Sequence, residues 1–472
     1  MRREAGGVGC ALLVAASICF ARGLPQPVEA ALARAGVPAS AVAVVVEPVD
    51  GAPLLAHRAE APMNPASVLK IVTAYSALDL LGPAFTFRTD FLVRGELANG
   101  ILDGDLVIRG GGDPKLTHDK LWQAAHQLRS RGLREVRGDV ILDRAYFAPT
   151  PPHDPARFDN DPRRAYNVGA DALLVSFNAI DFRFIPGSDG VRIVAEPDLP
   201  NVEIVSRIQV TKAPCDAWRK DLRHDVHENG LIAAVTFSGS LAASCGERSW
   251  PLAIFDAPRF TESVLRWVLS EAGGVVRGRV RAGATPAEAK LLYRLESEPL
   301  ANLVRDMNKF SNNVMARHIF LALSAEKTAG NGEIRASERL VRDWLKAKGI
   351  VAPELAVENG SGLSRESRAS AATLAAVLRS AWASPVMPEL AASFPLLAVD
   401  GTLKNRGTGS ASGRAHLKGG TLAGVQAQAG YVLDTRGKWW IVVMMVNHAN
   451  ANATQPALDA LVEWVVSRSE KR

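Results

Sequence analysis

Cysteine, clustered positive charge and long apolar runs are all scarce in this sequence of 472 residues. Two of its 4 cysteines, Cys10 and Cys19, lie in an apolar stretch near the amino terminus, and no later segment is long and apolar enough to span a membrane. The net charge of +6 comes from scattered residues, without a basic stripe interleaved with aromatic side chains. The sequence therefore gives little support to a nucleic-acid-binding protein or to a multi-span membrane protein.

The amino-terminal apolar stretch has the features of an export signal. Met1, Arg2 and Arg3 form a positive start, and residues 8–20 form an apolar run that is too short for a comfortable membrane span. We expect residues 1–21 to be a signal peptide that is removed after Ala21. The mature protein is then exported, either soluble or loosely associated with the membrane.

Export changes the interpretation of the remaining cysteines. Only Cys215 and Cys245 stay in the mature chain, and an even pair in an oxidising compartment predicts a disulfide. Two unpaired buried thiols are the alternative.

Other motifs lack the partners that their chemistry needs. His224 and His227 are flanked by acids, but no third metal ligand is evident, so no metal site is predicted. The glycine-rich stretch 110–113 lacks the Gly-Lys-Ser/Thr ending of a phosphate-binding loop. No fixed-period repeat occurs.

The pattern of elements suggests one domain interrupted by another. A β-branched run over 41–47 and a helical pattern after residue 64 indicate an α/β fold. Long helical patterns and two final strands return between 298 and 467. Short strand-like segments separated by Gly and Pro predominate between them. We expect residues 22–86 and 292–472 to form one domain and 87–291 to be a β-rich insertion, with a second sub-domain at about 181–260 left open.

The first functional signal is a lysine one helical turn after a serine. Ser67 and Lys70 lie on one face of the helical pattern, and Leu69, Ile71 and Val72 give the lysine apolar surroundings. A serine hydroxyl needs a base to become a nucleophile, and a lysine serves as a base only when its pKa is depressed. Taken alone, the pair is explained as well by a helix cap and a surface lysine.

Two later motifs change that assessment. Ser311-Asn312-Asn313 lies between two helical patterns, and Lys418-Gly419-Gly420-Thr421 lies on an expected strand before the final hairpin. Ser-x-x-Lys, Ser-Asp-Asn and Lys-Thr-Gly together mark the β-lactamases and penicillin-binding proteins, and all three have a counterpart here in that order, the last two with one substitution each. The mature chain resembles the low-molecular-mass class C penicillin-binding proteins, which are D-alanyl-D-alanine carboxypeptidases and endopeptidases. Further stretches that carry this resemblance are residues 64–67, 110–114, 138–143, 359–365, 400–403 and 429–432.

The resemblance implies a penicillin-binding fold, mixed α/β, with a large insertion between the first and second motifs. It implies periplasmic hydrolysis of peptidoglycan stem peptides through an acyl-enzyme, inhibition by β-lactams, and no cofactor. Ser67 would be the nucleophile and Lys70 its base. Ser311 would relay a proton, Asn313 would contact an amide of the substrate, and Lys418 would be the cation that attracts the substrate carboxylate. The backbone N–H groups of Ser67 and Thr421 would form the oxyanion hole, and Gly420 would let the strand approach closely.

Three further residues follow from the same resemblance. Asp143 is expected to meet the amine of the stem's diamino acid, and Arg365 its carboxylate. Gly419 departs from the family pattern, in which a threonine hydroxyl helps to hold the substrate carboxylate.

Two other functions remain open at this stage. One is a β-lactamase or esterase on the same fold, for which no deacylating acid is recognisable near the motifs. The other is a catalytically weak wall-binding scaffold that uses the insertion as an interaction module. The oligomeric state and the balance between carboxypeptidase and endopeptidase activity are not determined by the sequence.

Overall fold

The computed structural model describes residues 23–148, 154–407 and 409–467. The signal peptide expected over residues 1–21 lies outside these described residues. None of the helices within them combines the length and apolar character that crossing a bilayer requires.

The two ends of the chain build one antiparallel five-stranded sheet, with the strand order β16-β17-β18-β1-β2. Its strands are β1 (Val42–Pro48), β2 (Leu55–His57), β16 (Ala415–Leu422), β17 (Val425–Leu433) and β18 (Trp439–Asn447). Strands β1 and β18 are apolar on both sides because helices cover both faces of the sheet. Strand β16 lies at one edge of this sheet, which leaves one side of the strand free to meet other parts of the chain.

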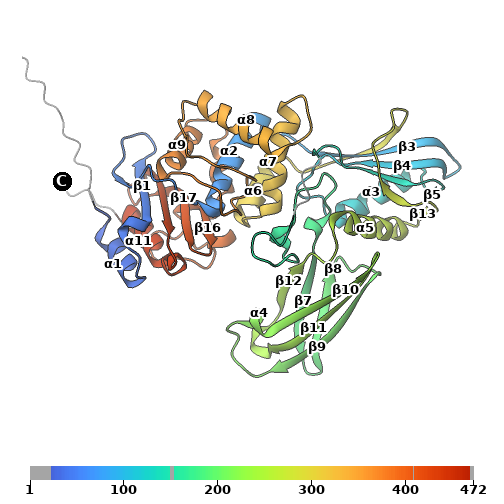
Figure 1. The fold of residues 1–472 in the computed structure, drawn as a ribbon, viewed down its shortest axis with the longest axis horizontal. Helices are drawn as coiled ribbons and strands as arrows, with labels where there is room; N and C mark the ends of the chain where they lie inside the picture. Colours follow the sequence, from blue (N-terminus) through green and yellow to red (C-terminus); the bar gives the residue numbers. More distant parts are fainter. Residues whose placement is uncertain (1–22, 149–153, 408, 468–472) are drawn as a thin grey trace, which may run out of the picture.

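Helices cover the sheet in two layers (Figure 1). Helices α1 (Gln26–Arg34) and α11 (Gln455–Val466) pack together on one face. The other face is covered by a larger bundle around the nearly all-buried α2 (Lys70–Leu81). The remaining helices of that bundle are α6 (Leu300–Lys309), α7 (Asn313–Lys327), α8 (Ile334–Ala347), α9 (Ala371–Trp382) and α10 (Met387–Ser393).

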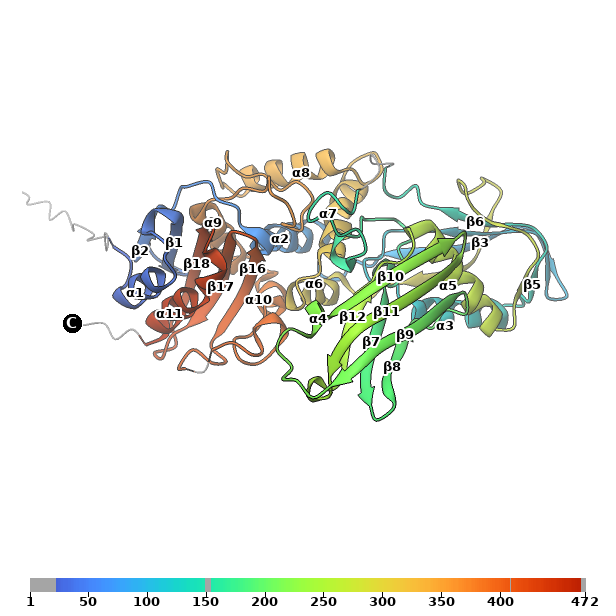
Figure 2. The ribbon, with the colours of Figure 1, turned by 60° about the horizontal axis from the view of Figure 1, so that its bottom comes forward.

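The chain leaves this body after α2 and returns to it at α6, and the segment between them forms a separate lobe (Figures 1 and 2). One sheet of the lobe has seven strands, in the order β13-β5-β4-β3-β15, with β6 between β4 and β14. Helices α3 (His118–Ser130) and α5 (Ala257–Glu271) pack beside each other against it. The strands are β3 (Arg88–Ala98), β4 (Ile101–Arg109), β5 (Glu135–Val136), β6 (Val140–Asp143), β13 (Val275–Val276), β14 (Val280–Ala282) and β15 (Lys290–Glu296).

The rest of the lobe consists of two three-stranded sheets, β10-β11-β9 and β12-β7-β8, and the short helix α4 (Trp218–Asp221). Cys215 and Cys245 are joined there in a disulfide. Buried side chains of these sheets belong to the same apolar cluster as those of α3 and α5. The strands are β7 (Ile180–Gly187), β8 (Gly190–Glu196), β9 (Val202–Thr211), β10 (Leu222–Asn229), β11 (Ile232–Ala242) and β12 (Arg248–Leu252).

The structure differs from the expected elements in three places. The segment expected to be β-rich contains α3 and α5, whose buried residues recur at helical spacing. Strand β15 pairs with β3, so the lobe's sheet continues to Glu296, beyond the expected boundary at residue 291. His224 and His227, which the sequence suggested to lie in a polar loop, lie on strand β10.

Candidate active site

Ser67 lies in a tight turn that leads into α2, rather than in the helix itself. Residues Ala66–Leu69 form the 3₁₀ turn η2, and α2 begins at Lys70. Ala66 has a φ of 46°, in the left-handed region that residues with a Cβ rarely occupy. Gly362 presses against this turn, and a Cβ on it would lie 1.9 Å from the Ala66 carbonyl oxygen. The surrounding structure therefore fixes the direction in which Ser67 projects.

Lys70 is completely buried and its ammonium group has three polar neighbours. Its Nζ lies 3.0 Å from Ser67 Oγ, 2.7 Å from Asn313 Oδ1 and 2.6 Å from the carbonyl oxygen of Ser361. A neutral amine has two N–H bonds and one lone pair. Because the amide and carbonyl oxygens can only accept, they take the two N–H bonds. The lone pair is then left for the Ser67 hydroxyl proton.

The surroundings of Lys70 favour that neutral amine. Burial, the nearby ammonium of Lys418 and the guanidinium of Arg317, in this order, hold the pKa of Lys70 well below its ordinary value. Arg317 is one turn after Asn313 on α7 and is itself buried, with its guanidinium donating to the carbonyl oxygen of Val168. Lys70 can thus act as a base at a pH well below the ordinary pKa of a lysine.

Ser311 and Lys418 form a second pair in the same cluster. Lys418 Nζ donates to Ser311 Oγ at 2.8 Å and to the Gly419 carbonyl oxygen at 2.6 Å. Burial lowers the pKa of Lys418 to about 7. Ser311 accepts from Lys418, and the hydrogen bonds of the described residues include none between Ser311 and Lys70.

Strand β16 reaches Ser67 at a glycine. A Cβ on Gly420 would lie 2.8 Å from the Pro65 carbonyl oxygen and 2.9 Å from the Ser67 amide nitrogen, so only glycine permits this approach. Gly419 faces open space, with no heavy atom within 4 Å of its ideal Cβ. The Thr421 side chain is exposed, and its hydroxyl donates to Gln426 Oε1 at 3.1 Å.

Arg365 lies beside this cluster. Its guanidinium stacks over Phe158 and donates to the Ala423 carbonyl oxygen at 2.9 Å. Phe158, from the lobe, joins Ala66 in a small apolar cluster. A cavity of about 580 Å³ opens there and is lined by Arg365, Phe158, Arg317 and Glu358, among others. Arg365 therefore lines the same cavity as Arg317, which belongs to the surroundings of Lys70.

Asp143 is not brought to the cluster. It ends strand β6 inside the lobe, and its carboxylate accepts hydrogen bonds from Ala145 and Thr285. It lines a separate cavity at the root of the lobe, together with Asp90, Arg109 and Arg294. Its proposed role as a substrate-binding aspartate rests on the resemblance of residues 138–143. In the structure, both of its carboxylate oxygens bond to residues of the lobe.

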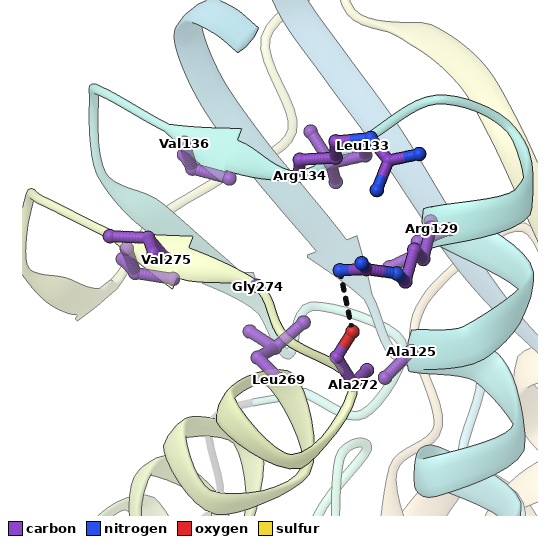
Figure 3. A pocket seen from close by; sticks show the side chains of 11 residues that line it. Ala125, Arg129, Leu133, Arg134, Val136, Leu269, Ala272, Gly274 and Val275 are labelled. Atoms are coloured by element: carbon purple, nitrogen blue, oxygen red, sulfur yellow. Dashed lines mark hydrogen bonds between the residues drawn. The ribbon is translucent and has the colours of Figure 1, made fainter. Parts of the chain in front are cut away.

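Another crevice lies between α3, α5 and the ends of β5 and β13 (Figure 3). Arg129 crosses it and donates to the Ala272 carbonyl oxygen at 2.9 Å, at the carboxyl end of α5. Its volume of about 20 Å³ has room for about one water molecule. This crevice is thus too small for a substrate.

Two participants in the cluster were missed at the sequence level. Ser361 contributes a backbone carbonyl, which has no side-chain signature, although it lies in the stretch 359–365 that carries the resemblance. Arg317 follows Asn313 by one helical turn. That spacing was a usable signal, since residues four apart share a helix face.

The fold is similar to that of the penicillin-binding proteins. The crystal structure of penicillin binding protein 4 from Haemophilus influenzae superposes with a TM-score of 0.77 at 23% identity, covering 93% of this chain and 99% of that one. The same protein in complex with a β-lactam gives a TM-score of 0.73, also at 23% identity, covering 94% of this chain and 100% of that one.

Sequence comparisons identify the family. The model of the D-Ala-D-Ala carboxypeptidase 3 (S13) family matches residues 24–467, and the chain belongs to this family. A D-alanyl-D-alanine carboxypeptidase from Actinomadura sp. is 30% identical over 433 residues, which are 86% of this chain and 77% of the relative. The D-alanyl-D-alanine carboxypeptidase DacB of H. influenzae is 27% identical over 394 residues, 82% and 80% of the two chains.

Proposed function

We propose that this carboxypeptidase cleaves peptidoglycan stem peptides in the periplasm through an acyl-enzyme on Ser67. The observation that carries the proposal is the buried Lys70 amine, whose Nζ lies within hydrogen-bond distance of Ser67 Oγ, Asn313 Oδ1 and the Ser361 carbonyl oxygen. Family membership supports the reaction class, and the unusual surroundings of Lys70 support the assignment of roles.

In the acylation step, Ser67 Oγ forms a bond to the carbonyl carbon of the penultimate D-alanine while its proton moves to Lys70 Nζ. The backbone N–H groups of Ser67 and Thr421 hold the resulting oxyanion. The C–N bond then breaks as Ser311 gives its proton to the departing amine, and the proton that Lys70 took from Ser67 replaces it, so that Lys70 is neutral again. Water next adds to the ester carbonyl carbon while its proton moves to Lys70; the bond to Ser67 Oγ then breaks, Ser67 takes that proton, and the shortened peptide is released.

Two cations are assigned to the substrate's carboxylates. Lys418, with Ser311 beside it, attracts the terminal carboxylate. The pKa of Lys418 is about 7, so its protonation can change near neutral pH. Binding of an anion there favours the protonated form of Lys418. Arg365 is assigned to the diamino acid of the stem. Asp143, which lines a separate cavity, stays a prediction for the amine of this diamino acid, and Asp154 and Glu358, which line the Arg365 cavity, are further candidates.

The proposal is tested by incubating the mature protein with monomeric and cross-linked pentapeptide muropeptides and identifying the products by mass. We expect release of D-alanine, and loss of that release in Ser67→Ala. Ser130→Ala is the matched control, because Ser130 is exposed on α3 and bonds only within its own helix. Muropeptide binding without any product would contradict the proposal and favour the scaffold alternative.

A labelled penicillin separates the peptidase from the β-lactamase alternative. We expect an adduct on Ser67 that persists for minutes or longer. Turnover of the adduct in less than a second would instead identify a β-lactamase.

A further inference from the structure

Ser311 occupies an unusual backbone position. It lies between α6 and α7 with a φ of 54°, and its hydroxyl is the acceptor for Lys418. A residue with a Cβ stays in this region only where its neighbours over-determine it. The contacts on both sides of Ser311 therefore decide where its hydroxyl lies.

The end of α6, directly before Ser311, is clamped onto the segment 393–401. Lys309 is buried, and its Nζ donates to both carboxylate oxygens of Asp400, at 2.9 and 2.6 Å, and to the Phe394 carbonyl oxygen at 2.7 Å. Asn308 Nδ2 donates to Ser393 Oγ at 2.8 Å. The backbone is also close, because a Cβ on Gly401 would lie 2.6 Å from the Lys309 carbonyl oxygen.

The same segment is bonded to strand β16 on its other side. The Leu397 amide donates to the Ala415 carbonyl oxygen, and the Leu417 amide donates to the Pro395 carbonyl oxygen, both at 2.9 Å. Asp400 Oδ1 accepts from the Leu396 amide at 2.8 Å, so the carboxylate that holds Lys309 also shapes this segment.

These contacts form a closed circuit. It runs from Ser311 to Lys418, along β16 to the segment 393–401, through Asp400 to Lys309, and back to Ser311. We propose that Lys309 and Asp400 are positioning residues, whose ion pair sets the place of the Ser311 hydroxyl relative to Lys418. The inference rests on the proposed function, because Ser311 matters only if it takes part in acyl transfer.

The expected effect follows from the tolerance of the chemistry. A displacement of a catalytic group by about 1 Å can cost about 100-fold in rate. Asp400→Asn keeps the oxygen that accepts from Leu396 but removes the charge that holds Lys309. We expect the acylation rate at saturating labelled penicillin to fall about 100-fold, with little change in the half-saturating concentration. Asp400→Glu, which restores the carboxylate, is expected to recover part of the rate.

A double-mutant cycle distinguishes positioning from a general structural role. If Asp400 acts through Ser311, Asp400→Asn has no further effect in a Ser311→Ala background, whereas unrelated effects multiply. Asp79→Asn is the matched control, because it breaks the Lys348–Asp79 ion pair of 2.8 Å elsewhere in the same helical bundle. We expect this control to acylate at the wild-type rate.

Two results overturn the inference alone: a wild-type rate in Asp400→Asn, or effects of Asp400→Asn and Ser311→Ala that multiply. Thermal unfolding of each variant is recorded, and the assays are run well below the lowest melting temperature, so that unfolding does not imitate the effect. A wild-type protein that forms no penicillin adduct instead overturns the proposed function, and the present inference with it.

Discussion

At the scale of single residues, the protein places three cations within one cluster. Lys70, Lys418 and Arg317 are all buried, and the charges of Lys418 and Arg317 disfavour a charge on Lys70. Arg317 is the most basic group of the three and has the carbonyl oxygens of Val168 and Tyr166 as partners for its guanidinium. It therefore keeps its charge, and Lys70 is the group that gives up its proton.

Arg317→Gln is expected to move the acid limb of the pH profile of kcat/KM to higher pH. Lys70 works as a neutral amine, so activity is lost as the pH falls through the Lys70 pKa. Removal of the Arg317 charge raises that pKa, because one of the cations that lower it is gone. The profile is measured with a chromogenic acyl substrate between pH 5 and pH 10.

Arg317→Lys is the control for this prediction. It keeps the charge, so the acid limb is expected to stay near its wild-type position even if packing is disturbed. An acid limb that shifts equally in both variants would contradict an electrostatic role for Arg317.

At the scale of elements, strand β16 and the turn η2 form the contact on which the cluster depends. Two neighbouring glycines test it. Gly420→Ala inserts a Cβ within 3 Å of the Ser67 amide nitrogen, so the strand must move away from the oxyanion position. The loss of one oxyanion donor costs about 3–4 kcal/mol, so we expect kcat to fall by a factor of at least about 100. Gly419→Ala adds a Cβ into open space, and we expect near wild-type kcat.

Steady-state kinetics of the two glycine variants on the same substrate give the comparison. Equal losses in both would mean that the strand does not depend on close approach at Gly420.

The two ends of the chain form the body around the five-stranded sheet, here called the catalytic body. The sequence predicted its elements better than those of the lobe. The structure brings Ser67, Lys70, Ser311, Asn313 and Lys418 together, and the sequence could propose them because each belongs to a short motif with a fixed spacing. Helices α3 and α5 were missed although Leu121, Ala124, Ala125 and Leu128 recur at helical spacing in α3. The many Gly and Pro turn signals around these helices favour short strands and oppose that periodicity.

Contacts between distant segments were beyond the reach of the sequence. The Lys309–Asp400 pair joins residues 91 apart, and although Asp400 begins the stretch 400–403 that carries the resemblance, nothing in the sequence pairs it with Lys309. Asp143 shows another limit of the sequence. A short match assigned it a role that stays a prediction, and the fold adds that its carboxylate accepts from Thr285.

At the scale of the whole molecule, catalytic body and lobe have separate apolar cores. The disulfide lies in the lobe, where it closes a loop with a sequence separation of 30 residues. Loop-closure entropy for this length predicts a stabilisation of about 3–4 kcal/mol. The joint replacement of Cys215 and Cys245 by Ser is therefore expected to lower the melting temperature of the lobe.

The same variant is expected to form the penicillin adduct at the wild-type rate. The residues that we assign to the reaction lie outside the lobe, in the catalytic body: Ser67, Lys70, Ser311, Asn313 and Lys418. Tryptophan fluorescence reports the lobe's unfolding through Trp218 and Trp250, which contact each other near the disulfide. An unchanged melting profile, or a loss of acylation at low temperature, would show that the two parts are not independent in this way.

The strand order also determines when the parts of the site can come together during synthesis. The nucleophile is made early in synthesis, whereas the strand that carries its distant cation is among the last to leave the ribosome. Until β16, β17 and β18 have joined β1, Ser67 has neither Gly420 beside its amide nor Lys418 nearby. A chain interrupted before that point therefore lacks groups that we propose for acyl transfer, and we expect it neither to cleave stem peptides nor to form an adduct with penicillin.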